Sequence, residues 1–271
     1  VADASTHLSF LSAMPVVPCR EDLARFAEML FVKTGNAVEV GTYQGGFAEY
    51  NLQHWNGTYY AVDAWSYRPG DGPDKNYEKE GINDANYERT RTRTNRFGSR
   101  VHLVRSLSVD AAHNFSDGFF DWVFIDALHT REALLADLRA WWPKLRAGGL
   151  MSGDDFGDRH LPPLAKPHFL QKGVAEMGEA EDKNPFFWRI PRDYDWGVMR
   201  ATSEFAKEQG AVLHVGWLTG KGKLEDSKAT CYTWNAWYIV KPYADKRAAS
   251  LASHVHTTAK QGLRGDPGPL L

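Results

Sequence analysis

The run VEVGTYQGGF at residues 38–47 decides the fold. It opens with a short apolar stretch, interrupted by Glu39, whose composition is typical of a buried strand. Gly41, Gly45 and Gly46 follow, and glycine lets the backbone turn sharply and approach a ligand closely. The run therefore predicts a strand, a tight turn and the start of a helix, which is an arrangement common in nucleotide-binding folds.

Strand-like and helix-like segments alternate on both sides of this run. We expect strands at 37–40, 59–62, 101–104, 122–125 and 150–152. Apolar residues recur with helical spacing at 21–32, 47–55 and 134–145. Strands that are separated by helices favour parallel pairing with right-handed crossovers.

The last third of the chain follows a different order. A helix is expected at 196–209, and two strands at 211–215 and 233–240 follow without a helix between them. Such a pair favours an antiparallel edge on a parallel sheet. The predicted fold is therefore a doubly wound, mostly parallel, seven-stranded Rossmann-like α/β sheet with an antiparallel edge strand pair and helices on both faces.

One large domain with extensions accounts for the length of the chain. We expect a lead-in at 1–20, the domain at 21–244 and a tail at 245–271. Within the domain, 157–195 is a long irregular insert, and inserts of this kind usually serve as lids or binding segments.

Composition excludes some functions. The formal net charge is -2, with 32 basic and 34 acidic residues, which argues against a nucleic-acid partner. No apolar run reaches the roughly 18 residues of a membrane span. Cys19 and Cys231 are expected to be reduced, although a single disulfide stays open. The compartment also stays open between the cytoplasm and an organelle entered with a targeting segment that is later removed.

The spacing of the glycines helps to distinguish between classes of nucleotide cofactor. A dinucleotide fingerprint needs a glycine at the position that Tyr43 occupies, which argues against a dehydrogenase that uses NAD. Asp63 ends the second expected strand, 22 residues after Gly41, where a carboxylate can accept the hydroxyls of a ribose. Glu39 lies inside an apolar strand and needs a partner, which a ligand ammonium or amide would supply.

These motifs together resemble a known family. The run at 38–47 with VDAW (62–65), FDWVFIDALH (120–129), WWPKLRAGGL (141–150) and GDD (153–155) is similar to class I S-adenosylmethionine-dependent methyltransferases. The later motifs look like the branch of metal-dependent O-methyltransferases that act on small molecules and sugars. The resemblance covers roughly residues 21–160.

The resemblance implies S-adenosylmethionine as the cofactor and assigns residues to its parts. The glycine turn with Glu39 would hold the methionine part, Asp63 the ribose, and Ser106 and Ser108 the adenine side. The full cofactor-binding set is expected to comprise Glu39, Gly41, Thr42, Tyr43, Gly45, Asp63, Ala64, Ser106, Ser108 and Asp126.

Three carboxylates are expected to meet at one edge of the sheet. Asp126 ends the fourth strand, and Asp154 and Asp155 end the fifth. They would repel one another without a cation, and oxygen ligation suits Mg²⁺, Mn²⁺ or Ca²⁺. In the related metal-dependent enzymes, the matching positions carry the metal. We therefore expect Asp126, Asp154 and Asp155 to be metal ligands, with Mg²⁺ or Mn²⁺ as the ion.

His129 is the expected catalytic base. A neutral imidazole accepts a hydroxyl proton near neutral pH, and His129 follows Asp126 by three residues. The family often has an acidic residue immediately before this histidine, where this chain has Leu128.

The predicted function is methyl transfer to a hydroxyl of a small molecule, assisted by a divalent metal. A non-catalytic, methyltransferase-like subunit of a larger assembly is the alternative. Self-association and the identity of the acceptor stay open. Aromatic residues near the irregular loops, Trp65 and Trp196 among them, either line an acceptor pocket or anchor the loops.

Overall fold

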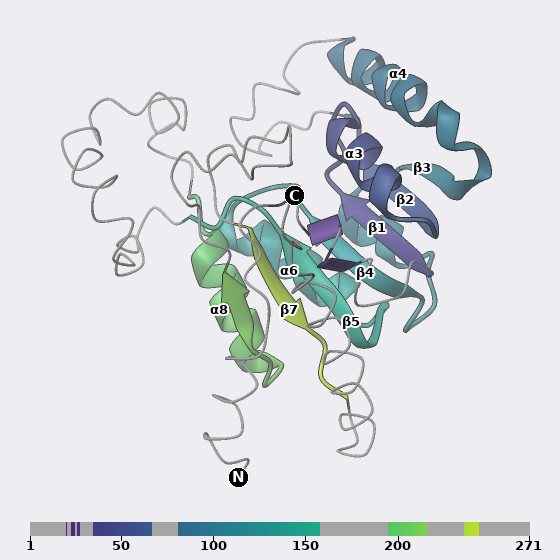
Figure 1. Cartoon of the computed structure of the whole chain (residues 1–271). Helices are drawn as coiled ribbons and strands as arrows, with labels where there is room; N and C mark the ends of the chain where they lie inside the picture. Colours follow the sequence, from purple (N-terminus) through teal and green to yellow (C-terminus); the bar gives the residue numbers. More distant parts are fainter. Residues whose placement is uncertain are drawn as a thin grey trace, which may run out of the picture.

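The computed structural model describes residues 20, 23–24, 26–27, 35–66, 81–157, 195–215 and 236–243. Figure 1 shows the helices and strands that they form. In chain order these are β1 (Asn36–Val40), α3 (Gly46–His54), β2 (Thr58–Asp63), α4 (Ile82–Thr94), η1 (Asn95–Arg100), β3 (Val101–Arg105), α5 (Ser108–Ala112), β4 (Phe120–Ile125), α6 (Arg131–Trp141), β5 (Leu145–Gly153), α8 (Val198–Glu208), β6 (Leu213–Val215) and β7 (Trp237–Val240).

The strands form one seven-stranded sheet in the order β3-β2-β1-β4-β5-β7-β6. Strands β1 to β5 pair in parallel, whereas β7 runs antiparallel to both β5 and β6. The predicted fold class is confirmed, including the antiparallel pair at the edge. The strand order reverses between β1 and β4, and ligands bind beyond the carboxyl ends of the strands at such a switch point.

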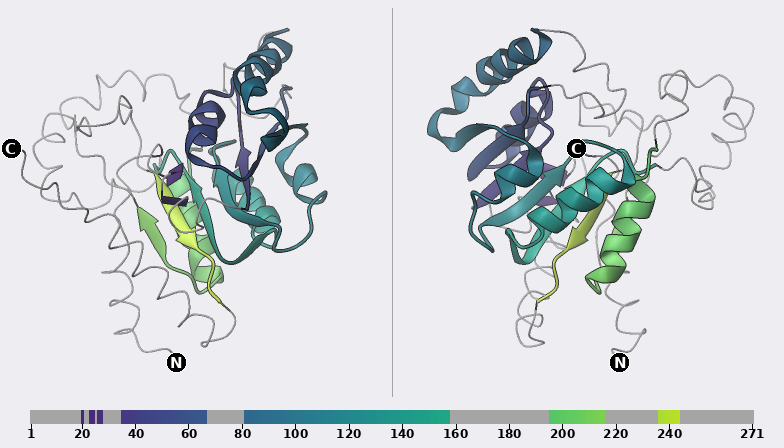
Figure 2. Two further views of the ribbon diagram at one scale, coloured as in Figure 1. Left: turned by 45° about the vertical axis from the view of Figure 1, so that its right-hand side comes forward. Right: turned by 180° about the vertical axis from the view of Figure 1, so that it is seen from behind.

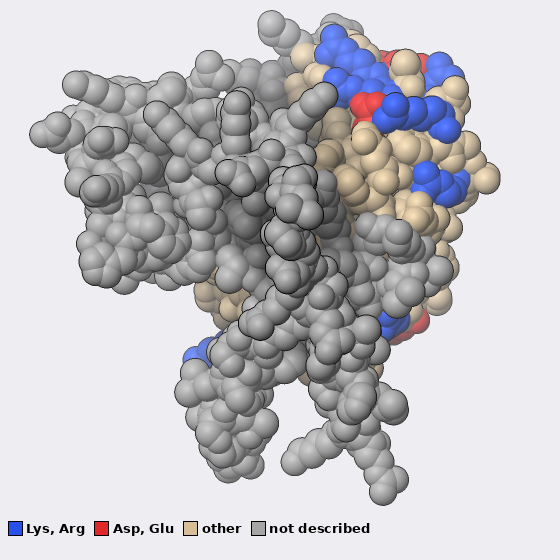
Figure 3. Space-filling view, in the orientation of Figure 1, with Lys and Arg blue, Asp and Glu red and all other residues tan. Residues whose placement is uncertain are grey.

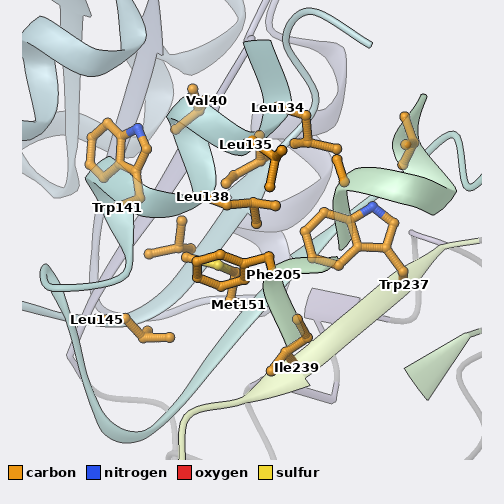
Figure 4. Packing of buried hydrophobic residues seen from close by; sticks show 14 of the residues in the cluster. Val40, Leu134, Leu135, Leu138, Trp141, Leu145, Met151, Phe205, Trp237 and Ile239 are labelled. Atoms are coloured by element: carbon orange, nitrogen blue, oxygen red, sulfur yellow. The ribbon is translucent and has the colours of Figure 1, made fainter. Parts of the chain in front are cut away.

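Helices cover both faces of the sheet, as Figure 2 shows from two further sides. On one face, α5, α6 and α8 pack on the sheet, and Leu138, Trp141 and Phe205 are fully buried there (Figure 4). On the other face, α3 and the helical residues 23–24 and 26–27 pack in the cluster that buries Trp55 and Trp122. The sheet is therefore shielded from water on both sides, and its strand ends are left to form a site.

The start of the fifth strand differs from the prediction. The helical spacing predicts a helix through Leu145 that closes at Gly148 and Gly149, but α6 ends at Trp141 and β5 begins at Leu145, opposite Phe120 on β4. Pro143 has no N–H to continue the helix. Gly148 then takes a φ of +73°, and a Cβ on it would lie 2.0 Å from the Tyr243 hydroxyl oxygen. The apolar spacing thus continued beyond the helix into the strand.

Helix α4 and the 3₁₀ helix η1 were not predicted. The buried residues of α4 are Asn86, Thr90 and Thr94, so the helix carries no apolar period to detect. In the last third of the chain, α8 begins at Val198 rather than at Trp196. Strand β6 spans Leu213–Val215, which is shorter than the strand expected at 211–215.

Arginines of α4 and η1 form the basic area at the upper right of Figure 3. Acidic neighbours offset part of this charge, because Arg91 pairs with Glu88 at 2.6 Å and Arg96 pairs with Glu49 at 3.0 Å. None of the helices in the described part of the chain has the length and apolar character needed to cross a membrane.

Several predictions concern residues outside the described part. These are the lead-in at 1–19, most of the helix at 21–32, the insert between 158 and 194, the first residues of the strand at 233–240, the tail from 245 and both cysteines.

Candidate functional site

The glycine turn lies directly against the end of β4. Gly41 has a φ of +95°, and a Cβ added there would lie 1.9 Å from the Asp126 backbone oxygen. The Gly41 N–H donates to Val62 O at 2.9 Å, and the Asp126 N–H donates to Val40 O at 2.8 Å. The turn therefore joins the ends of β1, β2 and β4 at the switch point of the sheet.

The middle of the turn is fixed by its neighbours. Tyr43 has a φ of +53°, and its carbonyl accepts from Trp65 Nε1 at 2.7 Å and from Thr90 Oγ1 at 3.1 Å. Gly45 has a φ of +73°, and a Cβ there would clash with Thr90. Trp65 is fully buried, so its indole anchors the turn.

Asp63 connects the turn to the end of β2. Its Oδ2 accepts from the Tyr43 N–H at 2.8 Å, and its Oδ1 accepts from the Trp65 N–H at 2.7 Å. The residue is 6% exposed. Asp63 thus holds the turn against the end of β2 through two backbone N–H groups. Ala64 follows it, and Thr42 is buried with its hydroxyl donating to Val62 O at 3.3 Å.

Glu39 has a partner within the protein. Its Oε2 accepts from the Tyr59 hydroxyl at 2.6 Å, and Asn51 Nδ2 donates to the same hydroxyl oxygen at 2.8 Å. Burial raises the pKa of Glu39 to about 8, against the opposing effect of the Tyr59 hydrogen bond. The sequence-based expectation assigned this partner role to a ligand, whereas the structure assigns it to Tyr59.

The two serines after β3 differ in their surroundings. The Ser106 N–H donates to Asp63 O at 2.9 Å, which places the start of this loop beside the end of β2. Ser108 Oγ accepts from Trp141 Nε1 at 2.9 Å and is hydrogen-bonded to the buried Asp137 on α6. Burial raises the pKa of Asp137 to about 7, and the bond to Ser108 opposes this shift. The Ser108 side chain thus contacts α6.

The expected acidic cluster is formed at the neighbouring ends of β4 and β5, where Ile125 lies opposite Gly153. His129 Nε2 lies 2.9 Å from Asp155 Oδ2 and 3.3 Å from Asp126 Oδ1. Thr130 follows and caps α6 by accepting from the Ala133 N–H at 3.3 Å, so the segment after β4 has a fixed end.

Charge dominates the protonation of this cluster. Burial acts to lower the pKa of His129, but the charges and hydrogen bonds of Asp155 and Asp126 outweigh it and raise that pKa well above its usual range. For Asp126, burial acts to raise the pKa, whereas the hydrogen bond from His129 and the charge of Arg20 lower it overall. The two carboxylates therefore favour the protonated form of His129.

Arg20 is a member of the cluster that the sequence did not indicate. Its Nη1 donates to Asp126 Oδ2 at 3.2 Å and to Asp154 Oδ2 at 3.1 Å. The guanidinium carbon lies 5.0 Å from the centre of the Phe47 ring on α3. Arg20 had been counted within the lead-in, and no motif connects it to residues more than a hundred positions away.

The three acids are therefore not equivalent. Ligand atoms of Asp126, His129 and Asp155 all lie within 4.8 Å of one another. Asp154 instead faces Arg20, and its Oδ1 is buried without a hydrogen-bond partner in the described part of the chain. Burial, together with the charges of Asp155 and Asp126, raises the pKa of Asp154 well above its usual range.

Comparisons with known proteins agree with this geometry. Residues 38–156, which hold β1 to β5, match a family described as a methyltransferase domain. Over these residues the chain is similar to class I S-adenosylmethionine-dependent methyltransferases, and the fold and the site agree with this match. No curated protein matches the chain.

Three solved structures are among those that are similar to this chain. A candidate S-adenosylmethionine-dependent methyltransferase from Methanococcus maripaludis is 13% identical with a TM-score of 0.50, over 89% of this chain and 93% of that one. An O-methyltransferase from Bacillus cereus, in complex with S-adenosylhomocysteine, is 15% identical with a TM-score of 0.47, over 87% and 88%. Spermidine synthase from Thermotoga maritima is 13% identical with a TM-score of 0.45, over 90% and 70%.

Proposed function

We propose that this chain is an S-adenosylmethionine-dependent O-methyltransferase that acts on a hydroxyl group of a small molecule. The observation that carries the proposal is the position of the cluster of Asp126, His129 and Asp155 beside the glycine turn. Gly41 contacts the Asp126 backbone directly, so a cofactor bound along the turn and an acceptor bound at His129 would be neighbours.

The cofactor side of the proposal uses the turn and Asp63. The carboxylate of Asp63 would accept the ribose hydroxyls while it continues to hold the N–H groups of Tyr43 and Trp65. The glycine that dinucleotide-binding folds have at the position of Tyr43 is not needed, because S-adenosylmethionine has no pyrophosphate that the backbone must approach closely. Glu39, the remainder of the turn and Ser106 would complete the contacts at the methionine and adenine ends.

The residues present fit a divalent cation. Asp126 and Asp155 supply carboxylate oxygens that lie close together, and Asp154 has a buried oxygen without a partner in the described part of the chain. Mainly oxygen ligands suit Mg²⁺ or Mn²⁺. When bound, such an ion lowers the pKa of a coordinated hydroxyl. Asp126 and Asp155 would hold it, with Asp154 as the third carboxylate if Arg20 moves aside.

His129 is the base of the proposed reaction. Its Nε2 takes the proton of the acceptor hydroxyl, and the acceptor oxygen then attacks the methyl carbon of the sulfonium group in line. The C–O bond forms as the C–S bond breaks, so S-adenosylhomocysteine leaves. His129 must be neutral for this role, and its pKa falls toward the usual range once the charges of Asp126 and Asp155 are engaged by another cation.

Transfer of a labelled methyl group to a panel of phenols and sugars tests the proposal. We expect transfer with Mg²⁺ or Mn²⁺, and a loss of about a hundred-fold or more in Asp155→Asn, because removing a group that acts at the reacting atoms costs roughly this much. Asp117→Asn is the control, since Asp117 is exposed and pairs with Lys144 at 2.7 Å, away from the cluster.

Two outcomes would contradict parts of the proposal. Full activity in EDTA would remove the metal from the mechanism. If the protein methylates no hydroxyl in the panel and co-purifies stably with a partner, the alternative hypothesis of a non-catalytic, methyltransferase-like subunit is favoured.

A further inference from the structure

We propose that Trp196 is a positioning residue that holds the imidazole of His129 in its working orientation. The proposal deepens the proposed methyl transfer and rests on it. Trp196 lies two residues before the start of α8, and its indole contacts both the His129 ring and the Asp155 backbone oxygen. Nothing in the motifs around the glycine turn or the acids assigns it a role.

The two rings are stacked. The ring centroids of His129 and Trp196 are 4.6 Å apart, and the ring planes differ by only 9°. On the edge of the imidazole, Nε2 faces Asp155 and Asp126. An imidazole that is covered on one face and held at one edge has lost most of its freedom to rotate, so Nε2 stays directed at the acids.

Trp196 is itself fixed by contacts at both of its ends. Its indole Nε1 donates to the Asp155 backbone oxygen at 3.2 Å. Its backbone forms an antiparallel bridge with Thr130, and the next residue, Gly197, donates its N–H to His129 O at 2.9 Å. Trp196 and His129 are therefore joined through the backbone as well as through their stacked rings.

The same tryptophan also restrains Asp155. This residue has a φ of +57°, a left-handed conformation that a non-glycine residue adopts at a cost. The indole hydrogen bond to its carbonyl helps to maintain that conformation. Trp196 thus orients the base and one of the carboxylates together, which is the arrangement that supporting residues provide in preorganised sites.

Steady-state kinetics with Trp196→Ala and Trp196→Phe test the role. We expect kcat to fall at least about ten-fold in Trp196→Ala, equivalent to roughly 1.4 kcal/mol, with the KM for S-adenosylmethionine little changed. Trp196→Phe, which retains a flat ring but loses the Nε1 bond, should recover most of the loss. The control is Trp142→Ala, because Trp142 is a half-buried tryptophan that packs edge-on against Phe205 at the far end of α6.

A double-mutant cycle separates positioning from a general structural effect. If Trp196 acts through His129, the substitution Trp196→Ala should cost little in the residual activity of His129→Ala. An equal loss in both backgrounds would overturn the proposal.

The ring contact is also measured directly by NMR, with the His129 resonances assigned from a His129→Gln spectrum. The proposal predicts an upfield ring-current shift of the imidazole protons that disappears in Trp196→Ala and persists in Trp142→Ala. Absence of this shift in an active enzyme overturns the inference alone. A stacked His129 in a protein that transfers no methyl group overturns the proposed function and, with it, the role of Trp196.

Discussion

Buried carboxylates define this molecule at the residue scale. Glu39 is bound by a tyrosine hydroxyl, Asp63 by two backbone N–H groups, and Asp126 by an arginine and a histidine. A buried acid that lacks such partners is costly. The fold thus already supports these three acids before any ligand binds.

Gly41 is needed both for the close packing of the strand ends and for the proposed cofactor-binding turn. Gly41→Ala should lower the free energy of unfolding by roughly 2 kcal/mol or more, because the new Cβ meets the Asp126 backbone and the φ is unfavourable. Cofactor binding should be lost with it. Gly210→Ala is the matched control, since Gly210 has a φ of +59° but nothing within 4 Å of a Cβ. Equal losses in the two variants, by chemical denaturation, would remove the close contact as the cause.

Asp137 gives a prediction on pH. Its pKa is raised by burial to about 7 in the folded chain, from 3.8 as its ordinary value. The folded state therefore binds the proton more tightly, so this contribution to stability is complete below about pH 4 and is lost as the pH rises through 7. Asp137→Asn carries no such loss.

The free energy of unfolding of Asp137→Asn, relative to the unmodified protein, should therefore rise by roughly 3 kcal/mol between pH 4 and pH 8. Denaturant titrations across this range measure the difference, with the exposed Asp117→Asn as the reference. Parallel stability curves for Asp137→Asn and the unmodified protein would show that Asp137 titrates normally.

The sequence revealed the residues whose role depends on local spacing. Gly41, Asp63 and Asp126 each follow a recognisable apolar strand, so their position at the sheet edge could be predicted. Arg20 and Trp196 could not be predicted in the same way. Arg20 reaches Asp126 and Asp154 across 106 and 134 residues, and only the folded chain brings them together.

At the scale of elements, the apolar pattern identified the strands more reliably than the helices. The run from Leu134 to Leu145 kept its helical spacing although the last of these residues belongs to β5. Helix α4 escaped detection because its buried face is made of asparagine and threonine, which bond to neighbouring backbone and side chains. A helix that buries polar residues shows no periodic pattern of apolar residues in the sequence. A proline can end a helix while the apolar residues after it continue the helical spacing.

Arg20 links the helical segment before β1 to the strand ends. Its side chain is 37% exposed, whereas that of Asp154 is 7% exposed. In EDTA, Arg20→Gln should lower the free energy of unfolding by about 1–2 kcal/mol, because the buried Asp154 and the half-buried Asp126 lose a positive partner that is itself partly screened by water.

Mn²⁺ should bind Arg20→Gln more tightly, since the guanidinium no longer competes for the carboxylates, and should restore the lost stability. Thermal unfolding with and without Mn²⁺ measures both effects. Arg91→Gln is the control, because Arg91 forms an exposed pair with Glu88 on α4. Unchanged stability and unchanged Mn²⁺ affinity in Arg20→Gln would show that Arg20 and the ion do not share a site.

At the scale of the whole molecule, the alternation of strands and helices was sufficient to predict the sheet and its antiparallel edge. The strand order places β1 and β4 side by side at the centre, so the glycine turn and Asp126 are adjacent by topology. This arrangement accounts for the similarity to a methyltransferase domain. Under the proposed function, the choice of acceptor would depend on side chains around His129 rather than on the sheet.

The central claim is that the glycine turn and Asp63 bind S-adenosylmethionine, and titration calorimetry with this compound and with S-adenosylhomocysteine tests it most directly. We expect both to bind one site per chain with a Kd on the order of micromolar, equivalent to roughly 8 kcal/mol. Asp63→Ala should weaken both by about ten-fold or more, since the ribose contacts and the hold on the turn are lost together. No heat of binding from either compound at millimolar concentration, with a folded protein, would contradict the account.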